Sequence, residues 1–121
     1  MAAPPIRALI IQPDTTHEVR EIEQDIRTFH GLVGGKPELF STEHCTLWFN
    51  TVQCARMPLN SMATYLWWTV CPEMEGRGAL GGTVFVTGPA DDCFDSLSVP
   101  DEIVELYERM EQILRETREE A

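Results

Sequence analysis

Short apolar blocks separated by polar turns run through most of the chain. Blocks that are rich in β-branched and aromatic residues predict buried or half-buried strands. A helix is predicted over 61–70, because Asn60 or Ser61 can cap its start and Pro72 prevents its continuation. The strands predicted in the same way cover residues 6–11, 38–41, 45–50 and 83–87.

The segment 15–33 allows two predictions. Its apolar residues recur every three or four positions, a periodicity that favours one helix ended by Gly34 and Gly35. The alternative is an edge strand over 17–22 followed by a shorter helix over 25–33. The apolar residues in question are Val19, Ile22, Ile26, Phe29 and Val33.

The clearest element is a helix predicted over 99–120. Pro100 suits its first turn, where a missing N–H costs nothing, and Asp101 and Glu102 lie where the helix dipole favours anions. The apolar residues that form one stripe along it are Ile103, Leu106, Tyr107, Met110, Ile113 and Leu114.

Together these elements predict an α+β fold and a single domain over 1–121. We expect a mixed or antiparallel sheet of four or five strands, two helices packed on it, and a long, acidic, amphipathic C-terminal helix. That helix either docks on the same core or forms a homodimer with a second copy. An acidic loop over 89–98 joins it to a core over 6–88.

Charge adds to this picture, because the chain of 121 residues carries 20 acidic and 9 basic residues and a net charge of −11. Such a charge repels phosphate backbones and anionic lipids, so we expect no direct binding of nucleic acid or membranes. Residues 91–121 hold 11 acids and 3 bases, which gives 3 − 11 = −8 for this segment alone. A row of carboxylates like this suits a protein partner with a basic surface.

The residues predicted to bind such a partner are Asp91, Asp92, Asp95, Glu105, Glu108 and Glu111, with Trp68 as an aromatic anchor. Each has a simpler interpretation. Neighbouring aspartates are common in turns, a packed helix needs a solvated polar face, and Trp68 can cover the rim of the sheet beside Trp67.

Several strings resemble motifs but lack the required context. Residues 76–81 match G-x-G-x-x-G, yet they follow a helix and lead into a strand, the reverse of a dinucleotide-binding turn. A small-ligand or nucleotide-binding module is nevertheless the alternative function. Its candidate residues are Asn50, Asn60, Gly76 and Gly78.

The cysteines do not indicate a disulfide framework or a metal site. The four cysteines, at 45, 54, 71 and 93, contain no C-x-x-C pair, and only His44 and Cys45 form a close pair of possible ligands. We predict no catalytic residues, no metal and no cofactor. With no readable signal peptide and no apolar stretch long enough for a membrane span, we expect a cytoplasmic protein.

A family resemblance adds a biological setting. Five short segments carry it. They are the opening strand 6–10, the helix stop at 32–35, the strand ending at Asn50, the tripeptide 58–60 and the strand 82–86. These segments resemble the domain of unknown function family 3846. The similarity is expected to cover about 6–88 and to leave the last helix outside. It implies an extended segment at 19–22, which favours the strand-then-helix prediction.

The resemblance implies a phage accessory protein in the host bacterial cytoplasm, with no established activity and no catalytic residues to transfer. Residues 51–54 replace the family's acidic, glycine-containing turn, so no role of that turn is transferred to this chain. The resulting hypothesis is a non-enzymatic binder of a host protein, with counter-defence or imitation of DNA as the roles considered.

Overall fold

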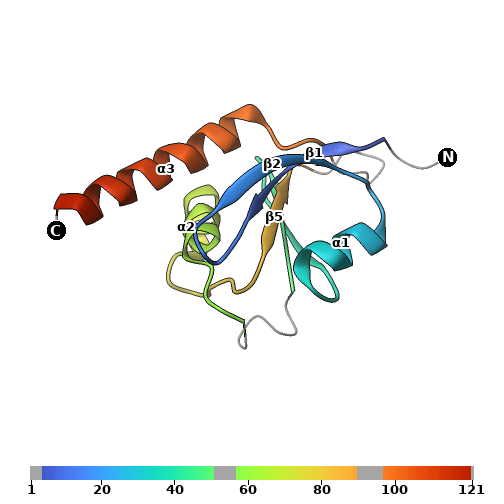
Figure 1. Ribbon diagram of the computed structural model, residues 1–121, viewed down its shortest axis with the longest axis horizontal. Helices are drawn as coiled ribbons and strands as arrows, with labels where there is room; N and C mark the ends of the chain where they lie inside the picture. Colours follow the sequence, from blue (N-terminus) through green and yellow to red (C-terminus); the bar gives the residue numbers. More distant parts are fainter. Residues whose placement is uncertain (1–3, 51–56, 90–96, 121) are drawn as a thin grey trace.

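The computed structural model describes residues 4–50, 57–89 and 97–120, with side chains described up to residue 117. These residues form five strands and three α-helices, with one short 3-10 turn, η1, after the second helix (Figure 1). Their bounds are β1 Ile6–Ile11, β2 His17–Ile22, α1 Ile26–Val33, β3 Glu38–Ser41, β4 Thr46–Phe49, α2 Ser61–Val70, η1 Pro72–Met74, β5 Val84–Thr87 and α3 Asp101–Glu120.

The strands form one sheet in the order β2-β1-β5-β4-β3. Every neighbouring pair is antiparallel, with Leu9 opposite Val19 on one side and Val86 on the other. The predicted α+β fold is therefore confirmed. The sheet has the larger of the two expected strand numbers, and it is antiparallel rather than mixed.

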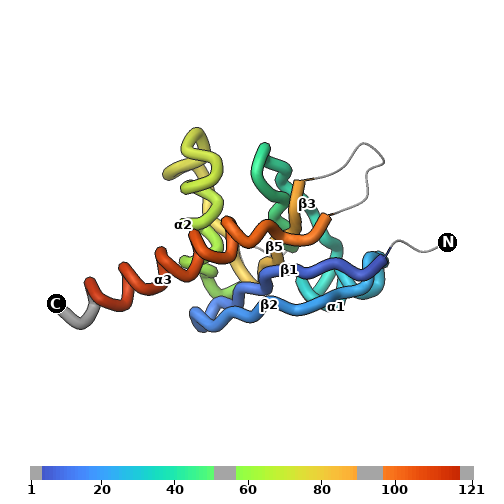
Figure 2. Tube along the Cα trace, turned by 90° about the horizontal axis from the view of Figure 1, so that it is seen from above, coloured from blue at the N-terminus to red at the C-terminus, as the bar shows by residue number. Residues whose placement is uncertain are grey.

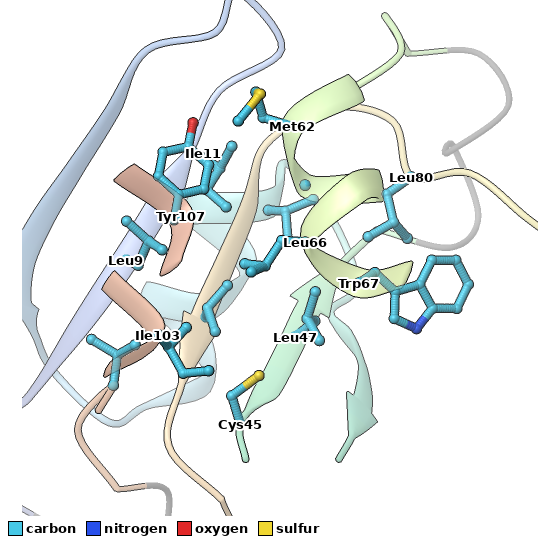
Figure 3. Packing of buried hydrophobic residues seen from close by; sticks show 14 residues of the cluster. Leu9, Ile11, Cys45, Leu47, Met62, Leu66, Trp67, Leu80, Ile103 and Tyr107 are labelled. Carbon is cyan, nitrogen blue, oxygen red and sulfur yellow. The ribbon is translucent and has the colours of Figure 1, made fainter. Parts of the chain in front are cut away.

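Helices cover both faces of this sheet. Side chains alternate along β1, so that Ala8 and Ile10 face α1, whereas Leu9 and Ile11 face α2 and α3. Because β1 and β5 are covered on both faces, they are apolar at almost every position. Figure 3 shows the face covered by α2 and α3, where side chains of both helices pack with Leu9 and Ile11 of β1.

The strand-then-helix prediction for residues 17–33 is confirmed, and the single-helix alternative is wrong. Residues 17–22 pair with β1 along their whole length, which satisfies their backbone groups in a ladder. A turn at 12–16 makes this return possible, and there Thr15 has a left-handed φ of 75°. α1 then starts separately, with the Asp25 carboxylate accepting a hydrogen bond from the Thr28 N–H at 2.7 Å.

The residues before α3 are tied to the opposite end of the chain. The Val99 N–H donates to the Arg7 carbonyl at 2.9 Å, and the Arg7 N–H donates to the Ser98 hydroxyl at 3.0 Å. α3 therefore begins at Asp101, two residues later than predicted, because Val99 still belongs to this tether.

α3 docks on the domain's own sheet, on the same face as α2, as the first of its two predicted arrangements states. Ile103 and Tyr107 are buried, whereas the exposed fraction of Ile113 is 54%. Figures 1 and 2 show why, since the C-terminal end of the helix projects past the rest of the molecule.

Candidate partner-binding site

The seating of α3 on the sheet decides which of its side chains face outward. Tyr107 is fully buried, and its ring lies against the His17 ring of β2 with centroids 4.7 Å apart. Figure 3 shows Tyr107 and Ile103 on one side of the core, with Leu66 of α2 opposite. Because Ile103 and Tyr107 of α3 point into the core, one flank of the helix faces β2 and the other faces α2.

Two hollows follow each other along the second flank of α3, beside α2, and we describe them as two sections of one surface. The wider section, of about 850 Å³, is bounded by the first turns of α3, the end of α2 and the turn between β3 and β4. A narrower section of about 240 Å³ lies farther along α3 and is lined by Tyr65, Met110, Ile113 and Leu114. We refer to the two sections together as the α2–α3 groove.

The narrower section exposes apolar surface. Tyr65 and Ile113 have exposed fractions of 42% and 54%, while Met110 and Leu114 between them are half-buried. Tyr65 comes from α2 and the other three from α3, so the two helices share this small patch, although other exposed apolar side chains lie elsewhere on the surface. A patch that gathers several apolar side chains is a candidate contact surface.

The wider section carries an excess of negative charge. Glu43, Glu102 and Glu105 contribute carboxylates, and Arg109 contributes the guanidinium. With His44 neutral, these side chains sum to 1 − 3 = −2. The groove therefore favours a ligand that brings cationic groups to one end and apolar groups to the other.

The three glutamates predicted as one binding row do not lie on the same flank of α3. Glu105 lines the groove, whereas Glu108 and Glu111 belong to the flank that faces β2. The Glu111 carboxylate lies 3.1 Å from His17 Nδ1 and accepts a hydrogen bond from Arg115 at 2.9 Å. Glu111 therefore helps to hold α3 on β2, and its side chain is only 21% exposed.

The contact between His17 and Glu111 leaves little room for a ligand. Glu108 approaches the same imidazole less closely, with 3.9 Å between its carboxylate and Nε2. A cavity of about 100 Å³ beside Glu111 and Arg115 has room for a few water molecules, not for a substrate. The predicted residues Asp91, Asp92 and Asp95 lie outside the described residues.

Trp68 serves the fold, although sequence reasoning offered it as an anchor for a partner. Its indole N–H donates to the Gly78 carbonyl at 3.1 Å, and the ring meets Tyr65 edge-on with centroids 5.9 Å apart. Trp67 is buried against Phe40. The aromatic ring of α2 that reaches the groove is Tyr65, which sequence reasoning missed. The available signal was that α2 is apolar on nearly every face, so one such residue had to point outward.

Asn60, one residue of the alternative ligand site, is a structural clamp. Its side-chain oxygen caps α2 by accepting from the Ala63 N–H at 3.1 Å. The amide nitrogen donates to the carbonyls of Ile11 and Gly82, at 3.0 and 2.8 Å. This buried amide therefore makes three hydrogen bonds within the protein.

The other residues of that alternative also have structural surroundings. Asn50 is buried and donates to the Val33 carbonyl at 3.4 Å. Gly76 has a φ of 75°, a conformation that glycine adopts without strain. Gly78 receives the Trp68 hydrogen bond and so belongs to the packing of α2.

Both cysteines in the described residues, Cys45 and Cys71, carry free thiols. Cys45 is buried, and burial raises the pKa of its thiol, an effect that the hydrogen bond from Thr42 partly offsets. Across the described residues, no group of three His, Cys, Asp or Glu side chains is arranged to hold a metal ion. No helix in the same residues is long and apolar enough to cross a membrane.

Comparison with known proteins gives one match. Residues 6–112 match the family described as Domain of unknown function (DUF3846). No curated protein and no solved structure matches the chain. The match extends beyond the expected 6–88, so the prediction that the last helix lies outside the resemblance is wrong. Ile103 and Tyr107 complete the core, which explains why the helix belongs with the domain.

Proposed function

The chain belongs to the DUF3846 family, and from this premise we propose that it is a non-enzymatic accessory protein that binds a protein partner with a basic surface. The α2–α3 groove carries the proposal, because it joins exposed apolar side chains to an excess of carboxylates. The proposal includes a phage origin and a host protein as the partner in the bacterial cytoplasm. These two parts rest on the resemblance of the sequence.

The overall charge supports this class of partner. A net charge of −11 opposes binding to nucleic acids and to anionic membranes, and it accelerates the approach of a cationic protein. The apolar section of the groove supplies what charge alone does not, since burial of apolar surface provides most of the affinity in protein complexes. Both parts of the surface are therefore assigned a role.

The test is recovery of a partner from host bacterial lysate with the full chain as bait. Neutralising Glu102 and Glu105 together, as E102Q and E105Q, removes two carboxylates of the groove without touching the core. The matched control is E21Q with E23Q, which removes the same charge from exposed positions on and beside β2. We expect one dominant partner that is lost in the first double variant and kept in the control.

Salt supplies a second readout, because contacts between exposed charges weaken as ionic strength rises. Recovery is expected to fall steeply above about 0.15 M salt, where the Debye length is about 8 Å. Recovery that neither depends on salt nor changes in the groove variant contradicts the proposal.

Neutralising Glu105, Glu108 and Glu111 together is a less specific test. Because Glu111 contacts His17 and Arg115, its replacement also loosens α3. A loss of the partner in that triple variant therefore has two explanations, and it needs a melting curve beside it.

A ligand panel separates this proposal from the small-molecule alternative. The wider section of the groove has the size of a ligand pocket, about 300–1,000 Å³ in known complexes. A ligand at about 100 times its dissociation constant stabilises the protein by about 2.7 kcal/mol, which a thermal-shift assay detects. A clear shift with one nucleotide or metabolite favours that alternative over a protein partner.

A further inference from the structure

We propose that the segment of the partner held in the α2–α3 groove is a basic amphipathic helix. This inference rests on the proposed function and specifies the chemistry of the partner. It follows from the length of the groove, from the helix side chains that line it and from where its charged side chains lie.

The groove has the length of a short helix. Along α3 its lining runs from Glu102 to Leu114, which at about 1.5 Å per residue spans roughly 18 Å. That distance corresponds to about three turns of a helix lying alongside. The two sections follow each other along α2 as well, since Tyr65 lines the apolar section and Thr69 lines the polar one.

The lining favours a helical occupant over an extended one. An added β-strand needs a strand edge with open backbone donors and acceptors, and the edges of this sheet are β2 and β3. The groove instead presents mainly side chains of two helices, and its apolar section lies in the middle of both, where the helix backbone bonds within each helix. An occupant of that apolar section must satisfy its own backbone hydrogen bonds, which a helix does.

Charge complementarity identifies the kind of helix. The wider section holds Glu43, Glu102 and Glu105 against Arg109 among apolar side chains, and the narrower section is lined by apolar and aromatic side chains alone. A helix with apolar residues at positions i, i+3, i+4 and i+7 and with Lys or Arg toward one end matches this order. A negatively charged helix meets repulsion at the carboxylate end.

The same argument disfavours a second copy of the chain. The projecting helix α3 contains eight acidic and three basic residues over 101–120, so its net charge is 3 − 8 = −5. Two such helices packed in each other's grooves bring carboxylates against carboxylates, which costs free energy. The homodimer considered from the sequence therefore becomes an outcome that the test can reveal.

The test uses a designed probe and the full chain. The probe is a fluorescein-labelled peptide of 14 residues, made of leucine and lysine, with leucine at helical spacing and lysine concentrated toward one end. One control peptide has the same composition in scrambled order, and another has glutamate in place of lysine. Fluorescence anisotropy is expected to show binding of the helical basic peptide at least about tenfold tighter than that of either control.

Variants of the protein locate the binding site. Ile113→Ser and Tyr65→Ser remove exposed apolar groups of the groove, and each is expected to weaken the helical peptide at least about fivefold. The matched control is Ile26→Ser, which removes the same side chain from α1, on the other face of the sheet, where its exposed fraction is 64%. Melting curves check that all three variants remain folded.

The outcomes separate this inference from the proposed function. Equal binding of the helical and scrambled peptides, or equal weakening by Ile26→Ser, overturns the helix-in-groove inference. A partner from lysate that is lost in the Glu102 and Glu105 variant but kept in Ile113→Ser has the same consequence, and it leaves the proposed function intact. A protein that sediments as a dimer, and becomes a monomer in Ile113→Ser, shows that a second copy occupies the groove and also overturns the inference.

Discussion

Replacement of Asn60 by alanine tests whether the buried amide is a clamp of the fold. This side chain is fully buried and joins three elements, because it caps α2 and also bonds the end of β1 and the segment before β5. Alanine at this position leaves the first turn of α2 without its cap. It also leaves two buried carbonyls, those of Ile11 and Gly82, without this donor.

The cost of Asn60→Ala follows from these bonds. Loss of an N-cap costs about 1 kcal/mol, and each buried carbonyl that loses a donor costs roughly 1 kcal/mol more. The expected loss in the free energy of unfolding is therefore about 3 kcal/mol. For a domain of this size that corresponds to a fall in melting temperature of about 12 °C, at about 4 °C per kcal/mol.

Urea titration followed by tryptophan fluorescence measures this loss, with Asn60→Ser and Asp25→Ala as comparisons. Serine retains a capping oxygen but cannot donate to both carbonyls, so Asn60→Ser is expected to recover about 1 kcal/mol of the loss. Asp25 caps α1 at an exposed position without bridging other elements, so Asp25→Ala is expected to cost less than Asn60→Ala.

Two outcomes refute the reasoning. Stability of Asn60→Ala within about 1 kcal/mol of the wild type means that the buried carbonyls find other donors without loss. Full recovery in Asn60→Ser means that only the cap matters and that the clamp contributes nothing. Either result also reopens Asn60 as a residue available to a ligand.

Two further predictions concern buried titratable groups. Burial and the nearby Glu111 carboxylate raise the pKa of Tyr107, so the folded state keeps its proton while the unfolded chain loses it above about pH 10. The free energy of unfolding is therefore expected to fall as the pH rises past 10. Tyr107→Phe removes a hydroxyl that has no hydrogen-bond partner among the described residues, so it is expected to reduce that fall and to be neutral or stabilising at pH 7. Urea curves at pH 7 and 10.5 check both expectations, and an unchanged pH dependence in the variant contradicts the reasoning. Because burial raises the pKa of the Cys45 thiol, iodoacetamide at pH 8 is expected to label Cys71 well before Cys45 in the folded protein. Mass spectrometry of peptides measures the two labelling rates, and equal rates for the two thiols contradict the prediction.

Local sequence patterns predict most of the helices and strands because caps, turns and apolar periodicity depend only on neighbouring residues. The branched run at 6–11, the cap at Asn60 and the apolar stripe of the last helix each specify a helix or strand from neighbouring residues alone. The stretch 17–22 is the exception. Its spacing matches a helix, yet it forms a strand because β1 offers a ladder along its full length, and that pairing depends on residues elsewhere in the chain.

The acidity of the C-terminal segment is a property of the sequence, but the direction in which each of its carboxylates points is decided only by tertiary packing. Once Tyr107 is seated on the sheet, Glu105 faces the groove and Glu111 turns to His17. Packing likewise assigns Trp68 to a hydrogen bond with Gly78 and brings Tyr65 to the surface. The physical reason is that helical spacing defines the angles between side chains on a helix, whereas the direction of each one depends on how the whole helix docks.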